Sequence, residues 1–229
     1  MDEFLIVAHR GASAYAPENT KKSIELAFKQ KANAIEIDIR MTKDNVAICY
    51  HDETLKKAGL DEHVEDVDYQ TIKDLDIEGE PLITFDEAMS IINDKLLTLI
   101  DLRDEKSVLY ALDYIEKNKL KNIVLISGRD YILRRIRELN KSIKIGFWYV
   151  RYSNPFSLAE ELNINFLKPM FRFCHKSDID KAHQIKKKIL TWVVNDKETM
   201  AHFIDLGIDG IVTNDPALLY VVAKEKGII

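Results

Sequence analysis

The sequence has few cysteines and no long apolar run, and each shortage excludes a class of protein. Two cysteines among 229 residues, Cys49 and Cys174, are too few for a disulfide framework, so we expect a reduced, cytoplasmic chain. The N-terminus carries acidic residues where a secretory signal carries basic ones. No apolar run approaches the length of a membrane span, which predicts no stable membrane insertion.

An excess of positive charge is also missing. The net charge is −5, which disfavours nucleic acid and anionic membranes as partners, because both usually bind a basic face. No serine, cysteine or threonine has the flanking signature of a catalytic nucleophile, such as G-x-S-x-G. An anionic small-molecule substrate would therefore have to be held by a metal and a few local cations. The oligomeric state is left open.

Short apolar runs alternate with segments of helical periodicity along residues 1–229, which we interpret as one domain. Strict alternation indicates parallel strands, and eight strand–helix units at this length fit a closed (β/α)8 barrel, an α/β fold. An open doubly wound sheet is the alternative, but no glycine-rich phosphate-binding sequence follows the first run. The expected strands are 4–8, 34–40, 96–102, 122–126, 144–149, 165–168, 189–194 and 209–213.

One apolar run breaks the alternation. Residues 46–50 follow the second strand too closely for a parallel crossover, so they should return as an antiparallel hairpin through a tight turn at 44–45. That register places His51 opposite Asp38, on one face with Glu36. A turn longer by one residue would move His51 to the other face.

A polar, acid-rich insertion follows the hairpin at residues 53–80. A long insertion at the functional end of a barrel often shapes or covers the site. The alternative is a packed excursion on the surface, and the sequence does not decide between the two.

Two carboxylates belong to the second expected strand, where isoleucines alternate with polar residues. If the isoleucines pack outward against helices, Glu36 and Asp38 share the inner face of the barrel. Two carboxylates that close repel each other unless a cation lies between them. Oxygen ligands suit Ca²⁺ or Mg²⁺ better than zinc. The alternative is an exposed polar face that pairs with lysines.

Asp101 lies near the end of the third expected strand, with Arg103 two residues further on. A barrel places this strand end beside the second one, so Asp101 is a candidate third metal ligand. Arg103 would face the same cavity and could hold a phosphate oxygen. The alternative is a simple Asp–Arg ion pair at a strand end.

Two histidines end apolar runs in the same way. His9 and His51 are candidate acid/base catalysts, because strand ends of a barrel carry reactive groups. Arg10 follows His9 and offers a rigid fork that matches phosphate geometry. Trp192 ends the seventh expected strand, where it either lines the site or packs in the core. The other four histidines are expected to be surface or packing residues: His63, His175, His183 and His202.

An ordered set of short motifs runs along nearly the whole chain: HRG at 9–11, PENT at 17–20, EID at 36–38, HDETL at 51–55, WVVN at 192–195 and GIDGIVTNDP at 207–216. This set resembles the motifs of the glycerophosphodiester phosphodiesterase family. The resemblance implies a (β/α)8 barrel, a divalent cation and two acid/base histidines. The catalytic roles carry over onto His9 and His51, and the metal-binding roles onto Glu36 and Asp38.

The chain departs from the family pattern in three places. A Glu-x-Lys of the third strand is replaced by Asp101-Leu102-Arg103, whose carboxylate is shorter by about 1.5 Å. A Ser-Phe after the next strand is replaced by Ser127-Gly128, which removes an aromatic wall. An Arg-Thr-Thr run is replaced by Lys56-Lys57-Ala58.

The resemblance implies metal-dependent hydrolysis of glycerophosphodiesters to glycerol 3-phosphate and an alcohol by two acid/base histidines. We assign His9 as base and His51 as acid, although the sequence does not distinguish this order from the reverse. A lysophospholipase D-like or sphingomyelinase D-like activity is an alternative that would need an apolar trough for an acyl chain. A catalytically silent phosphate-binding barrel is the third hypothesis, and the Asp101 and Arg103 replacements are its support.

Overall fold

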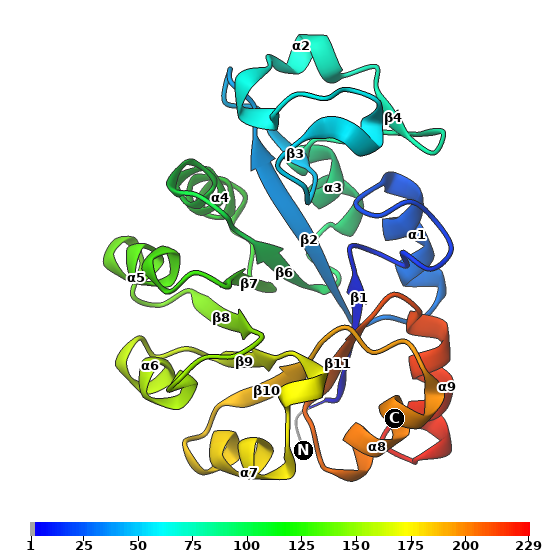
Figure 1. Cartoon of the computed structure of the whole chain (residues 1–229), viewed down its shortest axis with the longest axis vertical. Coiled ribbons are helices and arrows are strands. Elements are labelled where there is room, and N and C mark those ends of the chain that lie inside the picture. The colour runs from blue at the N-terminus through cyan, green and yellow to red at the C-terminus, as the bar shows by residue number, and fades with distance from the viewer. Residues whose placement is uncertain (1–2) are drawn as a thin grey trace.

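Eight parallel strands close into a ring in the computed structural model, which describes residues 3–229 (Figure 1). The ring closes because β1 pairs with both β11 and β2. The predicted barrel is therefore confirmed. Its strands are β1 (Leu5–His9), β2 (Ala34–Met41), β6 (Leu97–Asp101), β7 (Ile123–Ser127), β8 (Lys144–Tyr149), β9 (Phe166–Pro169), β10 (Lys188–Thr191) and β11 (Gly210–Thr213).

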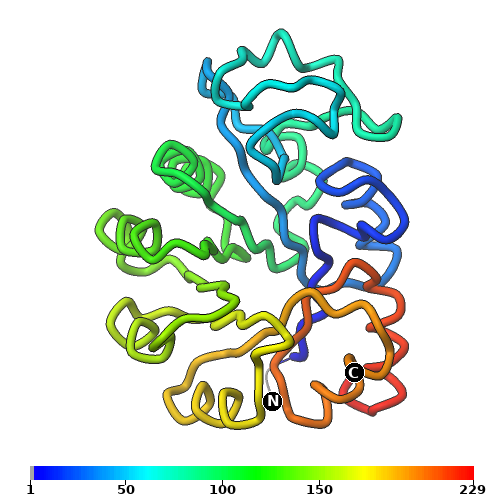
Figure 2. Tube along the Cα trace, viewed as in Figure 1, coloured from blue at the N-terminus to red at the C-terminus, as the bar shows by residue number. Residues whose placement is uncertain are grey.

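Helices surround the ring, and the chain passes once around it from N- to C-terminus (Figure 2). Residues with good capping side chains begin several of them; Thr84 and Glu87 form a reciprocal capping box, for example. No helix within residues 3–229 is long and apolar enough to cross a bilayer. The helices of the ring are α1 (Lys21–Lys29), α3 (Phe85–Ile92), α4 (Glu105–Asn118), α5 (Asp130–Leu139), α6 (Pro155–Glu161), α7 (Lys176–Gln184), α8 (Lys197–Asp205) and α9 (Pro216–Glu225).

The apolar core has two layers. Outward-facing residues of the strands, such as Ile35, Ile37 and Ile39, are fully buried against the surrounding helices. Inward-facing residues, such as Val7 and Leu99, fill the barrel interior. The alternation predicted for β2 is thus confirmed, and it turns the polar residues of that strand toward the barrel axis.

The predicted hairpin is present, but the predicted pairing of its strands was wrong by one residue. Strand β3 (Ala47–Cys49) runs antiparallel to β2, with Met41 opposite Ala47. The turn contains three residues, because the amide of Thr42 donates to the carbonyl of Val46 (2.9 Å). His51 is therefore not opposite Asp38. It lies beyond the end of β3, so the sheet register does not fix its direction.

The insertion at 53–80 forms a small layer over β3, at the top of Figure 1. An apolar cluster of its own, which includes Tyr50, Leu55 and Ile72, holds it against the hairpin. The insertion is therefore a packed unit, and its Lys57 also reaches the site described below. Its elements are the 3-10 helices Leu55–Ala58 and Val64–Asp66, α2 (Tyr69–Ile72), β4 (Asp76–Ile77) and β5 (Glu80–Pro81).

Gly210 tests the tightness of the barrel interior. A Cβ at this position would lie 2.6 Å from both the Cβ and the carbonyl oxygen of Leu5. Gly210→Ala should lower the free energy of unfolding by about 1–3 kcal/mol, because overpacking forces the backbone to shift. Urea unfolding measures this, with Ser90→Ala on the exposed face of α3 as control. An unfolding free energy equal to that of the wild type would contradict the packing described here.

Candidate active site

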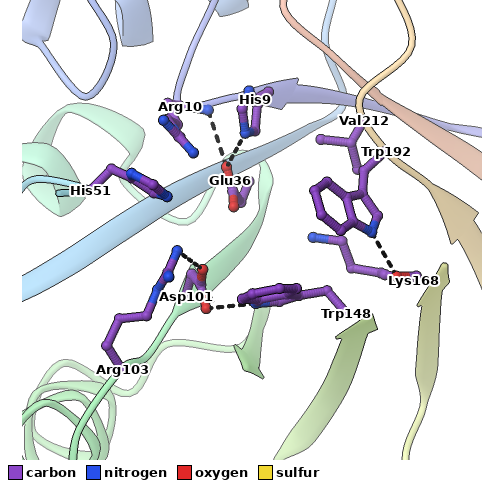
Figure 3. Close-up of a pocket in the computed structure, with 10 residues that line it drawn as sticks. All are labelled: His9, Arg10, Glu36, His51, Asp101, Arg103, Trp148, Lys168, Trp192 and Val212. Atoms are coloured by element: carbon purple, nitrogen blue, oxygen red, sulfur yellow. Dashed lines mark hydrogen bonds and ion pairs between the residues drawn. The ribbon is translucent and has the colours of Figure 1, made fainter. Parts of the chain in front are cut away.

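The carboxyl ends of the barrel strands surround a cavity of about 150 Å³ (Figure 3). Seven of the eight residues predicted for the site line this cavity, and Asp38 lies directly beside it. The structure therefore brings the predicted residues together around one cavity, and their catalytic, metal-binding and substrate-binding roles stay predictions. The lining residues are His9, Arg10, Glu36, His51, Asp101, Arg103, Trp148, Lys168, Trp192 and Val212.

Three carboxylates meet in the cavity floor because of strand register. Asp38 of β2 pairs with Asp101 of β6, and Glu36 lies two residues earlier on the same face of β2. All three are buried, and one oxygen of each lies within 4.8 Å of the other two. Three oxygen donors without nitrogen or sulfur suit a hard cation such as Ca²⁺ or Mg²⁺. The donor set therefore fits the cation that the sequence predicts.

Two arginines lie against these carboxylates. Nη2 of Arg103 is 2.8 Å from an oxygen of Asp101 and 3.3 Å from one of Asp38. Nε of Arg10 is 3.1 Å from the other oxygen of Asp38. Both arginines also line the cavity, so each can contact a bound phosphate as well as a carboxylate.

Burial and charge set the protonation of the three carboxylates. Burial raises the pKa of Asp101 to about 6, against the nearby charge of Arg103. Burial and the charge of Asp38 also raise the pKa of Glu36. Burial alone would raise the pKa of Asp38, but the charges of Arg10 and Arg103 and the hydrogen bond from Asn19 together lower it. The cluster therefore depends on neighbouring positive charge to remain ionised.

His9 is held by a neutral partner. Its Nδ1–H donates to the amide oxygen of Asn214 (2.7 Å), because an amide oxygen can only accept. Nε2 of the ring then points toward Glu36, at 3.9 Å from its carboxylate. Burial, with the charge of Arg10, lowers the pKa of His9 to about 4. The imidazole is thus neutral near pH 7, with a lone pair on Nε2.

His51 is held by a charged partner. Its Nδ1–H donates to a carboxylate oxygen of Asp52 (2.6 Å), which fixes the orientation of the ring. Arg40 fixes the backbone at this point, since its Nε and Nη2 both donate to the carbonyl of His51, at 3.1 and 2.9 Å. These two contacts position His51, which the strand register does not reach.

A chain of ion pairs links the insertion to the site. Lys57 of the insertion lies 3.0 Å from Asp52 and 2.8 Å from Glu18. Glu18 in turn accepts a hydrogen bond from Arg10 (2.7 Å). Lys57 stands within the Lys56-Lys57-Ala58 segment, so this departure from the expected Arg-Thr-Thr run still supplies a cation to the site.

Comparisons with known proteins identify the family. The sequence model of the glycerophosphoryl diester phosphodiesterase family matches residues 9–218. The chain belongs to this family. It is 29% identical over 242 residues to a glycerophosphodiester phosphodiesterase of Caldanaerobacter subterraneus subsp. tengcongensis, covering 97% of this chain and 99% of the relative. Family membership makes the chain an enzyme, a phosphoric diester hydrolase.

Solved structures confirm the family fold. A glycerophosphodiester phosphodiesterase from Thermotoga maritima matches with a TM-score of 0.84 at 24% identity, over 97% of this chain and 100% of that one. An Oleispira antarctica phosphodiesterase in complex with the product sn-glycerol-3-phosphate matches with a TM-score of 0.89 at 21% identity. That match covers 95% of this chain and 96% of the neighbour.

Trp148 is a site residue that the sequence analysis missed. It shares the inner face of β8 with Gly146, and its indole N–H donates to Asp101 (3.0 Å). The ring lies over Gly128, where a Cβ would be 2.6 Å from the ring atoms. The glycine that replaces the family phenylalanine thus leaves room for an aromatic wall from another strand. Arg103 stacks on the same ring, 5.3 Å from its centroid.

Lys168 and Asn19 were also missed. Lys168 is buried at the end of β9, and burial lowers its pKa against the charge of Glu36. Asn19, from the PENT segment, donates its side-chain amide to Asp38 (2.9 Å) and accepts from the Asp38 backbone amide (3.2 Å). A lysine within a short apolar run was a usable signal, whereas nothing in the spacing indicates the Asn19 contact.

The remaining expectations concern residues away from the carboxylates. Trp192 lines the cavity, and its ring centroid is 5.5 Å from that of Trp148. The two rings lie on the opposite side of the cavity from His51 (Figure 3). The four histidines expected to be surface or packing residues are exposed: His63, His175, His183 and His202.

Gly128→Ala should displace the ring of Trp148, because the added methyl group would overlap it. Trp148 and Trp192 are the protein's two tryptophans, so a change in the near-ultraviolet tryptophan circular dichroism reports directly on this wall. Ser90→Ala, on the exposed face of α3, is the control, since it changes one small residue away from both tryptophans. Identical spectra for Gly128→Ala and the wild type would contradict the described contact.

Proposed function

We propose that the enzyme hydrolyses glycerophosphodiesters to glycerol 3-phosphate and an alcohol, with a divalent cation and two histidines. The observation that carries this proposal is the meeting of three carboxylates, two arginines and two differently held histidines around one cavity. The product bound to the Oleispira antarctica neighbour, sn-glycerol-3-phosphate, supports the same substrate class.

Glu36, Asp38 and Asp101 would hold the cation, which supplies charge neutralisation at a phosphate oxygen. Arg10 and Arg103 line the cavity beside them and place fixed donors where phosphate charge develops. Burial strengthens both effects, because water screens charges less in an enclosed site.

The partners of the two histidines support different roles. The Nδ1–H of His9 donates to Asn214, which leaves Nε2 free to accept a proton from the attacking water. Asp52 binds Nδ1 of His51 and orients the ring, so Nε2 of His51 is the position from which a proton would pass to the leaving alkoxide. We therefore assign His9 as base and His51 as acid.

The cavity favours a small polar diester over a lipid. A lysophospholipid would need an apolar trough, but the apolar lining is limited to Trp148, Trp192 and Val212, and the other lining residues are charged or histidine. We also propose a cytoplasmic location, which the two free, buried cysteines support because neither is engaged in a disulfide.

Replacement of either histidine should remove most of the activity. His9→Ala and His51→Ala should each lower kcat by about 10²–10⁴-fold, the usual contribution of a general acid or base. Release of glycerol 3-phosphate from glycerophosphocholine measures this, with the exposed His202→Ala as control. Divalent-cation affinity should stay within about twofold of the wild type. Turnover at the wild-type rate in either active-site variant would refute the assignment.

Removal of divalent cations should abolish hydrolysis. Activity is expected to fall to background with a chelator and to return with excess Ca²⁺ or Mg²⁺, because the three buried carboxylates repel one another without a cation. Glu36→Gln should raise the cation concentration needed for half-maximal recovery, whereas Glu25→Gln on the outer face of α1 should not. Full activity in chelator would rule out metal dependence.

A further inference from the structure

A second hollow, of about 260 Å³, adjoins the catalytic cavity. The two share Arg103, whose side chain lines both. Arg40 and Glu53 also line the second hollow, and they flank the segment that carries His51. The hollow therefore opens beside the phosphate-binding position, on the side of the histidine assigned as acid.

Two of the arginines in this hollow have no carboxylate partner. Arg40 gives two hydrogen bonds to the carbonyl of His51. Arg129 donates to the carbonyl of Arg103 and to the hydroxyl of Tyr131. Within residues 3–229 neither arginine forms an ion pair, although both line one hollow. Oxygen atoms of neutral groups thus hold the two guanidinium groups in place, and no carboxylate is in ion-pair contact with either, although the charges of Glu53 and Asp104 still act on Arg40.

The acidic residues of the hollow do not fill this role. Asp104 is committed to the start of α4, where its carboxylate accepts from the amide of Ser107 (2.7 Å). Glu53 and Glu65 are exposed and form no ion pair with either arginine in the described part of the chain. An incoming anion can therefore still be bound by the arginines, and the glutamates should weaken that binding slightly by repulsion.

We propose that this hollow binds a second anionic group, a phosphate or carboxylate, on the alcohol arm of the substrate. The inference rests on the proposed function and names the substrate class. Glycerol is neutral and cannot form an ion pair with these arginines. The anionic group would therefore belong to the other arm of the diester, the one that leaves as the alcohol. Arginine is suited to this task because its planar donors match both anions. The leaving alcohol would then lie beside His51, as a general acid requires.

A third hollow, which shares His9 with the catalytic cavity, has a different character. Among the described residues no arginine lines it, and its one cation, Lys57, is already paired with the carboxylates of Glu18 and Asp52. Its other polar side chains include Tyr15, Glu78 and Asn214. Hydroxyl and carboxylate groups of this kind suit the hydroxyls of glycerol. The two arms of the diester would thus leave the phosphate in opposite directions, glycerol past His9 and the anionic alcohol past His51.

Binding of three glycerophosphodiesters tests the inference. Their alcohol arms end in a phosphate, a hydroxyl or a trimethylammonium: glycerophosphoglycerol phosphate, glycerophosphoglycerol and glycerophosphocholine. Affinities are measured in the His9→Ala variant, through the fluorescence of Trp148 and Trp192, so that no turnover is needed. The phosphate-terminated diester should bind about tenfold more tightly than the hydroxyl-terminated one, the size of a charge-assisted hydrogen bond. The ratio of kcat/KM in the wild type provides the same comparison.

Two substitutions should move this preference in opposite directions. Arg129→Gln should lower the ratio of the two affinities by about fivefold, and Glu65→Gln should raise it. Arg135→Gln is the matched control, because Arg135 lies on α5 outside the hollow and its loss changes the net charge equally. It should leave the ratio unchanged.

Equal affinity for the phosphate- and hydroxyl-terminated diesters would overturn the inference, as would an equal effect of Arg129→Gln and Arg135→Gln. Failure of the proposed function looks different: the wild type would hydrolyse none of the three diesters, whatever their affinities.

Discussion

The charge balance at the carboxyl end of the barrel is the constraint on which the site depends. Glu36, Asp38 and Asp101 are buried together, and burial penalises charged carboxylates unless positive charge lies close by. Arg10 and Arg103 supply part of that charge from the same strand ends. The buried Lys168 adds a third positive charge beside Glu36. Substrate phosphate would compete for the arginines, and the divalent cation that we propose would then supply the charge that keeps the carboxylates ionised.

The fold and the positions of the carboxylates could be predicted from the sequence, but the way in which His51 is held in the site could not. Strict alternation over residues 34–40 was enough to predict that Glu36 and Asp38 point into the barrel, because side-chain direction in a strand has a period of two. The predicted register of the hairpin was wrong because residues 44–45 tolerate a positive φ in turns of either length. One additional residue in the turn moves each side chain of the returning strand to the other face of the sheet. His51 nevertheless lies in the site, since Arg40 holds its carbonyl beyond the end of the ladder.

Contacts between strands were the part that spacing could not provide. Trp148 lies two residues after Gly146, on the same inner face of its strand, so the direction of its side chain was predictable. Its contact with Asp101 was not. The glycine at 128 looked like the loss of an aromatic wall, whereas it makes space for one. Lys168 was passed over as part of an apolar run. In each case the relevant partner lies on another strand, and only register brings the two together.

Anomalous diffraction from crystals grown with Mn²⁺ tests the central claim most directly, because it locates the ion without reference to activity. The account predicts one strong anomalous peak at the carboxyl end of the barrel, about 2.0–2.6 Å from carboxylate oxygens of Glu36, Asp38 and Asp101. A saturated crystal with no peak among these oxygens, or with its peak on other side chains, would contradict it.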